Sequence, residues 1–369
     1  MDTEQQVLSG GRLASIDALR GFDMFWIIGG QWIFAALHPI FENDTTAWVR
    51  TQLTHVEWEG FRSEDLIMPL FLFIVGVVMP FSLGKRTQRG DSRAQVYRHV
   101  IARTVILFVL GMIAQGNLLD LDLATFHIFS NTLQAIAAGY FISAIILLSL
   151  GLVGQIVTTV VLLLVFWLLM AVVPVPGHGA GVLTPEGNLA IYLDKLILGR
   201  FQDGTTYTWL LSSMTFACTV MLGAMAGHVL RCHKSRGVRV LLLLLAGLGC
   251  LLLGVVWDTR FPIIKHLWTS SFVLFSAGLC YLLLALFYLV IDVLGFRKWA
   301  FGFIVIGMNA IAVYMVTRVF DFRGIGDIFV GGLEKWTGDA HDLVRAVAGF
   351  AVLWLILWWM YRKRSFIKI

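Results

Sequence analysis

The sequence predicts an all-α, polytopic membrane protein with about ten transmembrane helices, and two observations lead to this fold class. Of the 369 residues, 58% are hydrophobic and only 14% are charged, whereas a soluble domain carries nearer a quarter charged residues. The apolar residues also occur in blocks of about 20, the length that a helix needs to cross a bilayer. Backbone polar groups in lipid must be satisfied internally, so blocks of this length indicate helices.

The spans follow one another along the chain as a single predicted domain, 1–369. They cover 18–38, 64–84, 98–116, 128–149, 153–173, 207–230, 238–257, 268–293, 299–319 and 343–361. A polar start leads directly into the first span, so no removable signal peptide is predicted. The four cysteines lie in or beside spans without metal-ligand spacing, which is typical of small core residues. They are Cys218, Cys232, Cys250 and Cys280.

The distribution of Lys and Arg predicts that both chain ends face the cytoplasm, because cytoplasmic loops retain positive charge. One set of connections, which includes both chain ends, carries sixteen of these residues, and the opposite set carries eight. The difference is clearest in the loop over 85–98, which holds five. The opposite side then holds three longer segments, 39–63, 174–206 and 320–342. The last two are rich in Gly and polar residues, which suits binding loops and plain connectors equally.

Several polar residues lie where lipid is expected. Asp17, Arg20 and Asp23 sit at the entrance of the first span. They are either an interfacial charge cluster or a binding lip for an anionic ligand that arrives from the cytoplasm. Farther out, other polar side chains lie at similar depth, as interhelical hydrogen-bonding groups or as the lining of an outward cavity. These are Gln31, His55, Asp65, Gln115, Asn117, Asn131, Gln134, Lys265, His266 and Asn309.

His55 lies in an acidic neighbourhood, His55-Val-Glu-Trp-Glu-Gly60, ten residues before Asp65. A histidine titrates near neutral pH and can act as base, acid or nucleophile. A carboxylate such as Asp65 could orient one ring nitrogen. A surface loop histidine is the alternative. A metal site built from His55, Glu57 and Glu59 is disfavoured because nothing supplies further ligands, so no metal is expected.

The sequence resembles the heparan-α-glucosaminide N-acetyltransferase family of transmembrane acyltransferases, which includes bacterial members. The motifs that carry the resemblance run over nearly the whole chain. They are Arg12-Leu-Ala-Ser-Ile-Asp-Ala-Leu-Arg-Gly-Phe-Asp23, His55-x-x-Trp58-x-Gly60, Asp65-Leu-Ile-Met-Pro-Leu-Phe-Leu-Phe-Ile-Val-Gly76, Leu133-Gln134, Gly187-Asn188 with Tyr192-Leu-Asp194, Phe261-Pro-Ile-Ile-Lys-His-Leu-Trp-Thr-Ser-Ser271 and Gly307-Met-Asn-Ala310 with Tyr314. Many members carry an arginine on either side of the Leu-Gln pair. Here Asn131 lies nearby and Ala135 follows directly.

The resemblance implies that acetyl-CoA, as co-substrate, delivers its acetyl group across the membrane to the amine of an amino sugar such as glucosamine. In the family the loop histidine is catalytic, which implies His55, assisted by the amide of Gln31 and by Asp65. His55 would either deprotonate the acceptor amine or accept the acetyl group as a covalent intermediate. Gln31 would stabilise the developing oxyanion, and Asp65 would orient the imidazole.

Further site residues are expected on the same grounds. The predicted donor-binding residues are Asp17, Arg20, Gln134 and Asn309, and the predicted acceptor-binding residues are Lys265, Trp58 and Trp268. The expected location is the bacterial inner membrane, with lipid as a partner, no nucleic acid, and a homodimer suggested by the resemblance. Two alternatives remain: a permease for amino sugars or muropeptides, and an O-acetyltransferase for an envelope glycan. A permease would favour repeated halves and broken helices, and the sequence shows neither convincingly.

Overall fold

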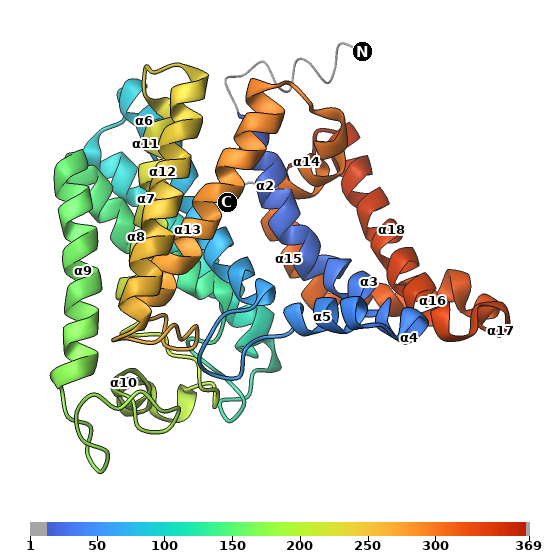
Figure 1. Ribbon diagram of the computed structural model, residues 1–369, viewed down its shortest axis with the longest axis horizontal. Coiled ribbons are helices and arrows are strands. Elements are labelled where there is room, and N and C mark those ends of the chain that lie inside the picture. Colours follow the sequence, from blue (N-terminus) through green and yellow to red (C-terminus); the bar gives the residue numbers. More distant parts are fainter. Residues whose placement is uncertain (1–12, 367–369) are drawn as a thin grey trace. The chain divides into compact units, whose positions relative to one another are not determined.

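The computed structural model describes residues 13–366, apart from the side chain of Thr87. Arg12, the first residue of the signature motif, lies outside this range. Within it every regular element is helical, and strand pairing is limited to isolated bridges (Figure 1). Nine helices of the described chain are long and apolar enough to cross a bilayer, and the number rises to ten if one bent pair is counted as a single span. The prediction of an all-α protein with about ten spans is therefore confirmed.

The chain divides into two compact units. Unit 1 combines the N-terminal part up to His55, residues 62–67 and the C-terminal part from Leu283 onward, and unit 2 holds residues 56–61 and 68–282. Each unit therefore gathers helices that are far apart in the sequence. The single domain expected over 1–369 stays a prediction.

Unit 1 is organised around a close contact between its first helix and the broken span. Helix α2 (Ala14–Phe25) runs through a π-helical stretch, Trp26–Gly30, into α3 (Gln31–Ala35). It packs on α14 (Phe301–Gly307), where a Cβ added to Gly307 would lie only 2.0 Å from the carbonyl oxygen of Asp17. Beyond Gly307 the chain bends by 65° into α15 (Ala310–Val319). The predicted span over 299–319 is thus two helices that meet at an angle.

Two of the predicted outer segments are largely helical. The segment over 39–63 contains α4 (His38–Phe41) and α5 (Asp44–Gln52), and the one over 320–342 contains α16 (Phe322–Val330) and α17 (Glu334–Thr337), followed by α18 (His341–Arg362). Capping explains the change, because Asn43 and Asp321 accept backbone N–H groups at the first turns of α5 and α16. The Gly-rich stretch at 324–326 also serves packing, since Gly326 lies directly against Gly349. The expectation of a loop over 320–342 was therefore wrong, while a binding role stays a prediction.

Unit 2 packs its helices around a contact between α6 and α11. It is built from α6 (Ile67–Gln88), α7 (Arg93–Gln115), α8 (Thr132–Ser149), α9 (Leu152–Val172), α10 (Leu189–Leu198), α11 (Ser213–Arg231), α12 (Arg236–Asp258) and α13 (Ser270–Phe287). The first residue of α6 and the last residues of α13, from Leu283, are assigned to unit 1. A Cβ on Gly76 would lie 1.9 Å from Val220 O, and one on Gly223 would lie 2.0 Å from Phe73 O. Small residues at such crossings let two backbones touch, as is typical of membrane helices.

The predicted segment over 174–206 contains a buried carboxylate. Asp194, on the short helix α10, accepts hydrogen bonds from the backbone N–H groups of Trp209 (2.7 Å) and Leu210 (3.0 Å). It thereby ties α10 to the chain that leads into α11. Burial raises the pKa of Asp194 from its usual 3.8 to about 6, although the two N–H donors oppose the shift.

The folded chain holds the proton of Asp194 more tightly than the unfolded chain does. The contribution of this proton to the free energy of unfolding is therefore full below about pH 4, and it disappears as the pH rises from about 4 to about 6. Between pH 5 and pH 7.5 the loss should be about 1.4 kcal/mol in the free energy of unfolding. Thermal unfolding of wild type and Asp194→Asn at these two pH values tests this, and the variant should lack that part of the pH dependence. Asp258→Asn, which replaces another carboxylate that accepts a backbone N–H group, should keep it. An Asp194→Asn profile parallel to wild type would contradict the assignment.

Candidate functional site

His55 and Asp65 form a pair in unit 1. The Nδ1 atom of His55 lies 3.0 Å from Oδ1 of Asp65. The carboxylate is buried, with 1% of its side chain exposed, whereas 47% of the histidine side chain is exposed. A buried acceptor thus holds one nitrogen of a ring that belongs to a half-exposed side chain. The role of Asp65 in orienting His55 stays a prediction, and the two side chains are in direct contact.

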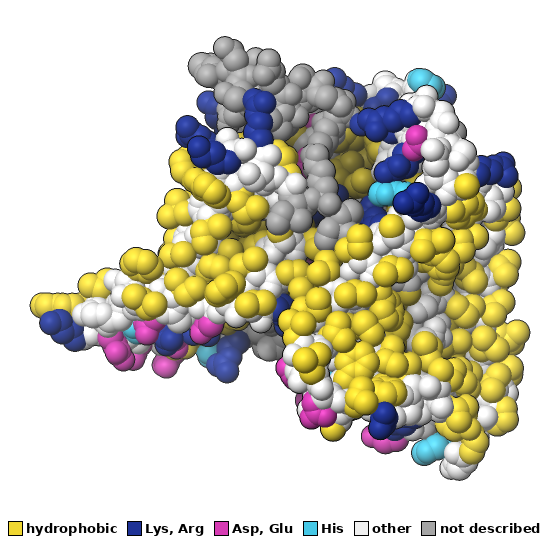
Figure 2. Space-filling model, turned by 180° about the vertical axis from the view of Figure 1, so that it is seen from behind, with side chains coloured by type: hydrophobic (Ala, Val, Ile, Leu, Met, Phe, Trp, Pro, Cys, Tyr) yellow, Lys and Arg dark blue, Asp and Glu magenta, His cyan; other side chains and the backbone are white. Residues whose placement is uncertain are grey.

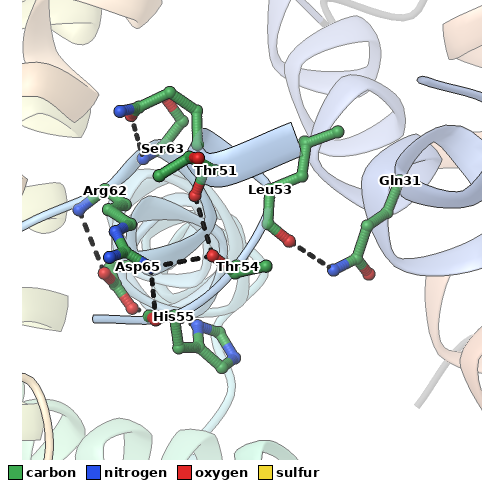
Figure 3. A network of polar contacts seen from close by, with 9 residues as sticks. Gln31, Thr51, Leu53, Thr54, His55, Arg62, Ser63 and Asp65 are labelled. Atoms are coloured by element: carbon green, nitrogen blue, oxygen red, sulfur yellow. Dashed lines mark hydrogen bonds and ion pairs between the residues drawn. The ribbon is translucent and has the colours of Figure 1, made fainter. Parts of the chain in front are cut away.

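The carboxylate of Asp65 is itself fixed by the turn that carries it. Asp65 lies in a short 3₁₀ helix, Ser63–Leu66, and its Oδ2 atom accepts the backbone N–H of Arg62 at 3.0 Å. The Arg62 side chain reaches back and donates to Thr54 Oγ1 (2.8 Å) and to the carbonyl of His55 (3.0 Å). Figure 3 shows these bonds, which join Arg62 to Thr54, His55 and Asp65. The histidine and its carboxylate are therefore tied together through backbone as well as side chains.

This arrangement selects one tautomer of His55. A carboxylate accepts hydrogen bonds and donates none, so the Nδ1 atom that faces Asp65 carries the proton. The lone pair then lies on Nε2, at the opposite side of the ring. A neutral imidazole held in this way can accept a proton or attack a carbonyl carbon, and the carboxylate stabilises the imidazolium that forms.

Gln31 supports the same segment from the first span. Its amide nitrogen donates to the carbonyl oxygen of Leu53 at 2.7 Å, two residues before His55 (Figure 3). A side-chain amide has two N–H bonds, so this contact uses one donor and leaves the second for another acceptor. Gln52 adds a further link, because its Oε1 atom accepts from both the backbone and the hydroxyl of Ser63. The catalytic role predicted for Gln31 stays a prediction. Its hydrogen bond to the carbonyl of Leu53 was not predicted from the sequence.

The other residues predicted in unit 1 lie on the helices that meet at the bend. Asp17 is buried on α2, and its carboxylate lies 3.8 Å from the guanidinium of Arg20. The charge-cluster interpretation of these two residues therefore has a direct contact behind it. Asn309 is buried at the break between α14 and α15. Donor binding by these three residues stays a prediction.

Trp58 and Lys265 come together in unit 2. An antiparallel bridge joins Glu59 to Ile264, so the motif around Trp58 and the one around Lys265 run side by side. Trp58 donates to the carbonyl of Leu183 at 3.0 Å, and Lys265 is buried. The family resemblance implied acceptor binding by both residues but gave no reason to expect them on neighbouring segments.

His266 completes this cluster, although it was not among the predicted site residues. Its ring stacks on Tyr207 with centroids 4.0 Å apart and lies edge-on to Trp58 at 5.3 Å. Its Nδ1 atom lies 2.6 Å from the hydroxyl of Thr206. The available signal was its position beside Lys265 in the most specific C-terminal motif.

Trp268 and Gln134 are buried and make structural contacts. The Trp268 indole N–H donates to Thr219 Oγ1 at 3.0 Å, and its ring packs edge-on against Phe216 and Phe272. Gln134 accepts the N–H of Ser130 at 2.8 Å and donates to a neighbouring carbonyl. Binding roles for both stay predictions. Over residues 13–366 no group of three or more His, Cys, Asp or Glu residues is placed to hold a metal ion.

Comparison with known proteins finds distant relatives. No family model matches the chain. The chain is 25% identical over 422 residues to heparan-alpha-glucosaminide N-acetyltransferase from Homo sapiens, covering 97% of this chain and 60% of the human protein. It is 24% identical over 425 residues to the protein of the same name from Mus musculus, covering 98% of this chain and 61% of that protein. The chain therefore spans about three fifths of the length of the curated relatives that it matches.

Proposed function

We propose that this chain is a transmembrane acetyltransferase that moves the acetyl group of acetyl-CoA to the amine of an amino sugar, such as glucosamine. The observation that carries the proposal is the His55–Asp65 pair, in which a buried carboxylate lies 3.0 Å from one nitrogen of a half-exposed imidazole. The distant relatives are named as N-acetyltransferases and align over nearly the whole of this chain, which supports the same reaction type.

Two routes use this pair. In the direct route, Nε2 of His55 removes a proton from the acceptor amine while the amine nitrogen attacks the thioester carbonyl. The C–N bond forms, the C–S bond breaks, and the thiolate leaves with the proton from His55. In the covalent route, Nε2 first attacks the thioester carbonyl, the C–S bond breaks, and CoA leaves as its thiolate, which gives an acetyl-imidazolium. The amine nitrogen then attacks the acetyl carbon, the bond from that carbon to Nε2 breaks, and Nε2 takes the proton of the amine and passes it on to the thiolate. The second N–H of Gln31 stabilises the oxyanion in either route.

The orientation that we propose places both chain ends in the cytoplasm and His55 on the opposite, periplasmic side of a bacterial inner membrane. The Lys/Arg asymmetry supports it. The donor is held by Asp17, Arg20, Gln134 and Asn309, and the acceptor by Trp58, Lys265 and Trp268. The neighbourhood of Trp58 and Lys265, whose chain segments are joined by the bridge between Glu59 and Ile264 and in which Trp58 contacts the His266 ring, supports binding of a polar sugar. The acting form is proposed to be a homodimer.

Asp65→Asn should lower acetyl transfer by about a hundredfold while KM for the acceptor changes little. An amide accepts or donates, so it no longer forces the proton onto Nδ1, and it stabilises an imidazolium less well than a carboxylate. Initial rates with saturating acetyl-CoA and varied glucosamine test this. Asp321→Asn, which changes another carboxylate of unit 1 that accepts a backbone N–H, should keep the wild-type rate.

Purified protein incubated with acetyl-labelled acetyl-CoA and glucosamine tests the proposed function directly. Formation of labelled N-acetylglucosamine is the expected result, and O-acetylated product instead would identify an O-acetyltransferase. A labelled protein trapped before acceptor is added would select the covalent route. Absence of transfer to any amino sugar would overturn the proposal.

A permease is the second candidate, and one observation favours it. The bent pair at 298–319, with the buried Asn309 at its break, is the kind of discontinuous span that transporters use for substrate binding. Proteoliposomes loaded with buffer and given labelled glucosamine separate the two functions. Uptake of unmodified sugar without acetyl-CoA would support the permease. Acetylated sugar that forms outside the vesicles, only when acetyl-CoA is supplied inside and without uptake of the sugar, would support the enzyme.

A further inference from the structure

Arg103 lies within a membrane-spanning helix. It follows the first residue of α7 by ten positions, which is about 15 Å along the helix axis. Its side chain is only partly exposed. An arginine at this depth is costly in lipid, and such residues normally face an anion or a polar cavity. The role of Arg103 therefore depends on what surrounds its guanidinium group.

The surroundings hold the guanidinium in place without neutralising it. Its central carbon lies 4.7 Å from the ring centroid of Tyr140 on α8, a cation–π contact. Over the described part of the chain, its buried Nε atom has no hydrogen-bond partner. The acidic residue of this region, Asp91, is paired with Arg86 at 3.2 Å. Arg103 also makes a side-chain hydrogen bond with Tyr140. It thus presents a restrained positive charge, and its five N–H donors exceed the one that this bond uses.

Two further basic groups lie at the same end of unit 2. His99 precedes Arg103 by four residues and therefore lies on the same face of α7. It is within electrostatic range of both Arg86 and Arg103. Helical side chains lean toward the helix N-terminus, so the Arg103 side chain extends toward His99 and the start of α7. Figure 2 shows Lys, Arg and His side chains gathered at the upper right of the view, over this end of unit 2.

We propose that Arg103, together with His99 and Arg86, forms a binding site for a phosphate group. A guanidinium presents paired N–H donors that match two phosphate oxygens, and the contact with the Tyr140 ring restrains the guanidinium group. Phosphate of this kind has two sources here: the nucleotide part of acetyl-CoA and the headgroup of an anionic phospholipid. Assignment to the acetyl donor rests on the proposed function, whereas the phosphate site itself does not.

The experiment measures binding of adenosine 3′,5′-bisphosphate to the purified full chain by titration calorimetry. Arg103→Gln should weaken binding about tenfold to a hundredfold, because a charge-assisted hydrogen bond is lost. Arg98→Gln is the matched control, since it removes the same charge from an exposed position of the same helix, and its affinity should stay within about twofold of wild type. Arg103→Lys keeps the charge but loses the paired N–H donors, so its nucleotide affinity should lie between those of Arg103→Gln and Arg98→Gln. It also tests the proposal if Arg103→Gln does not fold.

A second arm separates the two sources of phosphate. The same variants are placed in nanodiscs of phosphatidylcholine with and without phosphatidylglycerol, and their thermal unfolding is followed. If phosphatidylglycerol stabilises wild type and Arg98→Gln but not Arg103→Gln, while nucleotide affinity is unchanged, the phosphate belongs to a lipid. If neither nucleotide affinity nor lipid stabilisation responds to Arg103, the proposal is overturned. A chain that binds the nucleotide through Arg103 but transfers no acetyl group contradicts the proposed function and leaves the phosphate site standing.

Discussion

Replacing His55 with alanine should lower acetyl transfer to glucosamine by about a thousandfold or more. The substitution removes the group that is proposed to take the amine proton or to carry the acetyl group, and positioned acid–base groups alone contribute about 10² to 10⁴ in rate. Because the His55 side chain is half exposed, its loss leaves little empty volume. We therefore expect the variant to fold with nearly wild-type stability, so that the effect appears in kcat. Label transfer under saturating donor and acceptor is the measurement.

The matched control is His341→Ala. His341 also lies near a carboxylate of unit 1, with Nε2 3.4 Å from Asp327, but its own side chain is largely buried and Arg345 shares the same carboxylate at 3.1 Å. A histidine in that setting has no accessible nitrogen facing a reactant, so its loss should leave the rate within about threefold of wild type. Equal losses in both variants would show that stability, and not chemistry, limits the activity. An active His55→Ala enzyme would refute the site assignment.

Hydropathy predicted where the chain crosses the membrane but not where its helices start or bend. The third span was expected over 98–116, yet α7 begins at Arg93, because Ser92 caps it with a capping box and the charged first turns lower the local hydropathy. The bend of 65° after Gly307 was also missed. Composition does not reveal it, since the apolar residues on both sides read as one continuous span. The buried Asn309 lies at this bend.

In the candidate site, too, the sequence predicts some contacts and not others. The contact between His55 and Asp65 could be expected, because ten residues of loop and turn easily bring two side chains together. The bond from Gln31 to the carbonyl of Leu53 could not, since a backbone acceptor leaves no trace in residue type. Arg103 was passed over for another reason. One charge among apolar neighbours barely changes a hydropathy average. Its contact with Tyr140 and, within the described part of the chain, its unpartnered Nε atom set it apart.

Gly307→Ala should destabilise unit 1 by about 3 kcal/mol or more, the cost of overpacking a contact that cannot relax. The added Cβ would lie 2.0 Å from Asp17 O and 2.8 Å from Gly21 N, and both atoms belong to backbone. The reciprocal position is as tight, since a Cβ on Gly21 would lie 1.7 Å from Phe303 O. Neither helix can yield by rotating a side chain, so α2 and α14 must separate. Size-exclusion chromatography after a series of heating steps should show the variant lost at a lower temperature than wild type.

The same helix provides the control. At Gly302 an added Cβ would meet nothing nearer than the Trp354 indole nitrogen at 3.7 Å, an ordinary contact. Gly302→Ala should therefore be neutral or stabilising by about 0.4–1 kcal/mol, because alanine restricts the unfolded chain. Equal heat tolerance of the two variants would mean that α2 and α14 do not touch through backbone. Since Asp17 and Arg20 lie on α2 and Asn309 follows α14, a separation of these helices should also displace the residues proposed to hold the acetyl donor. Any Gly307→Ala protein that stays folded should accordingly show a raised KM for acetyl-CoA, whereas Gly302→Ala should not.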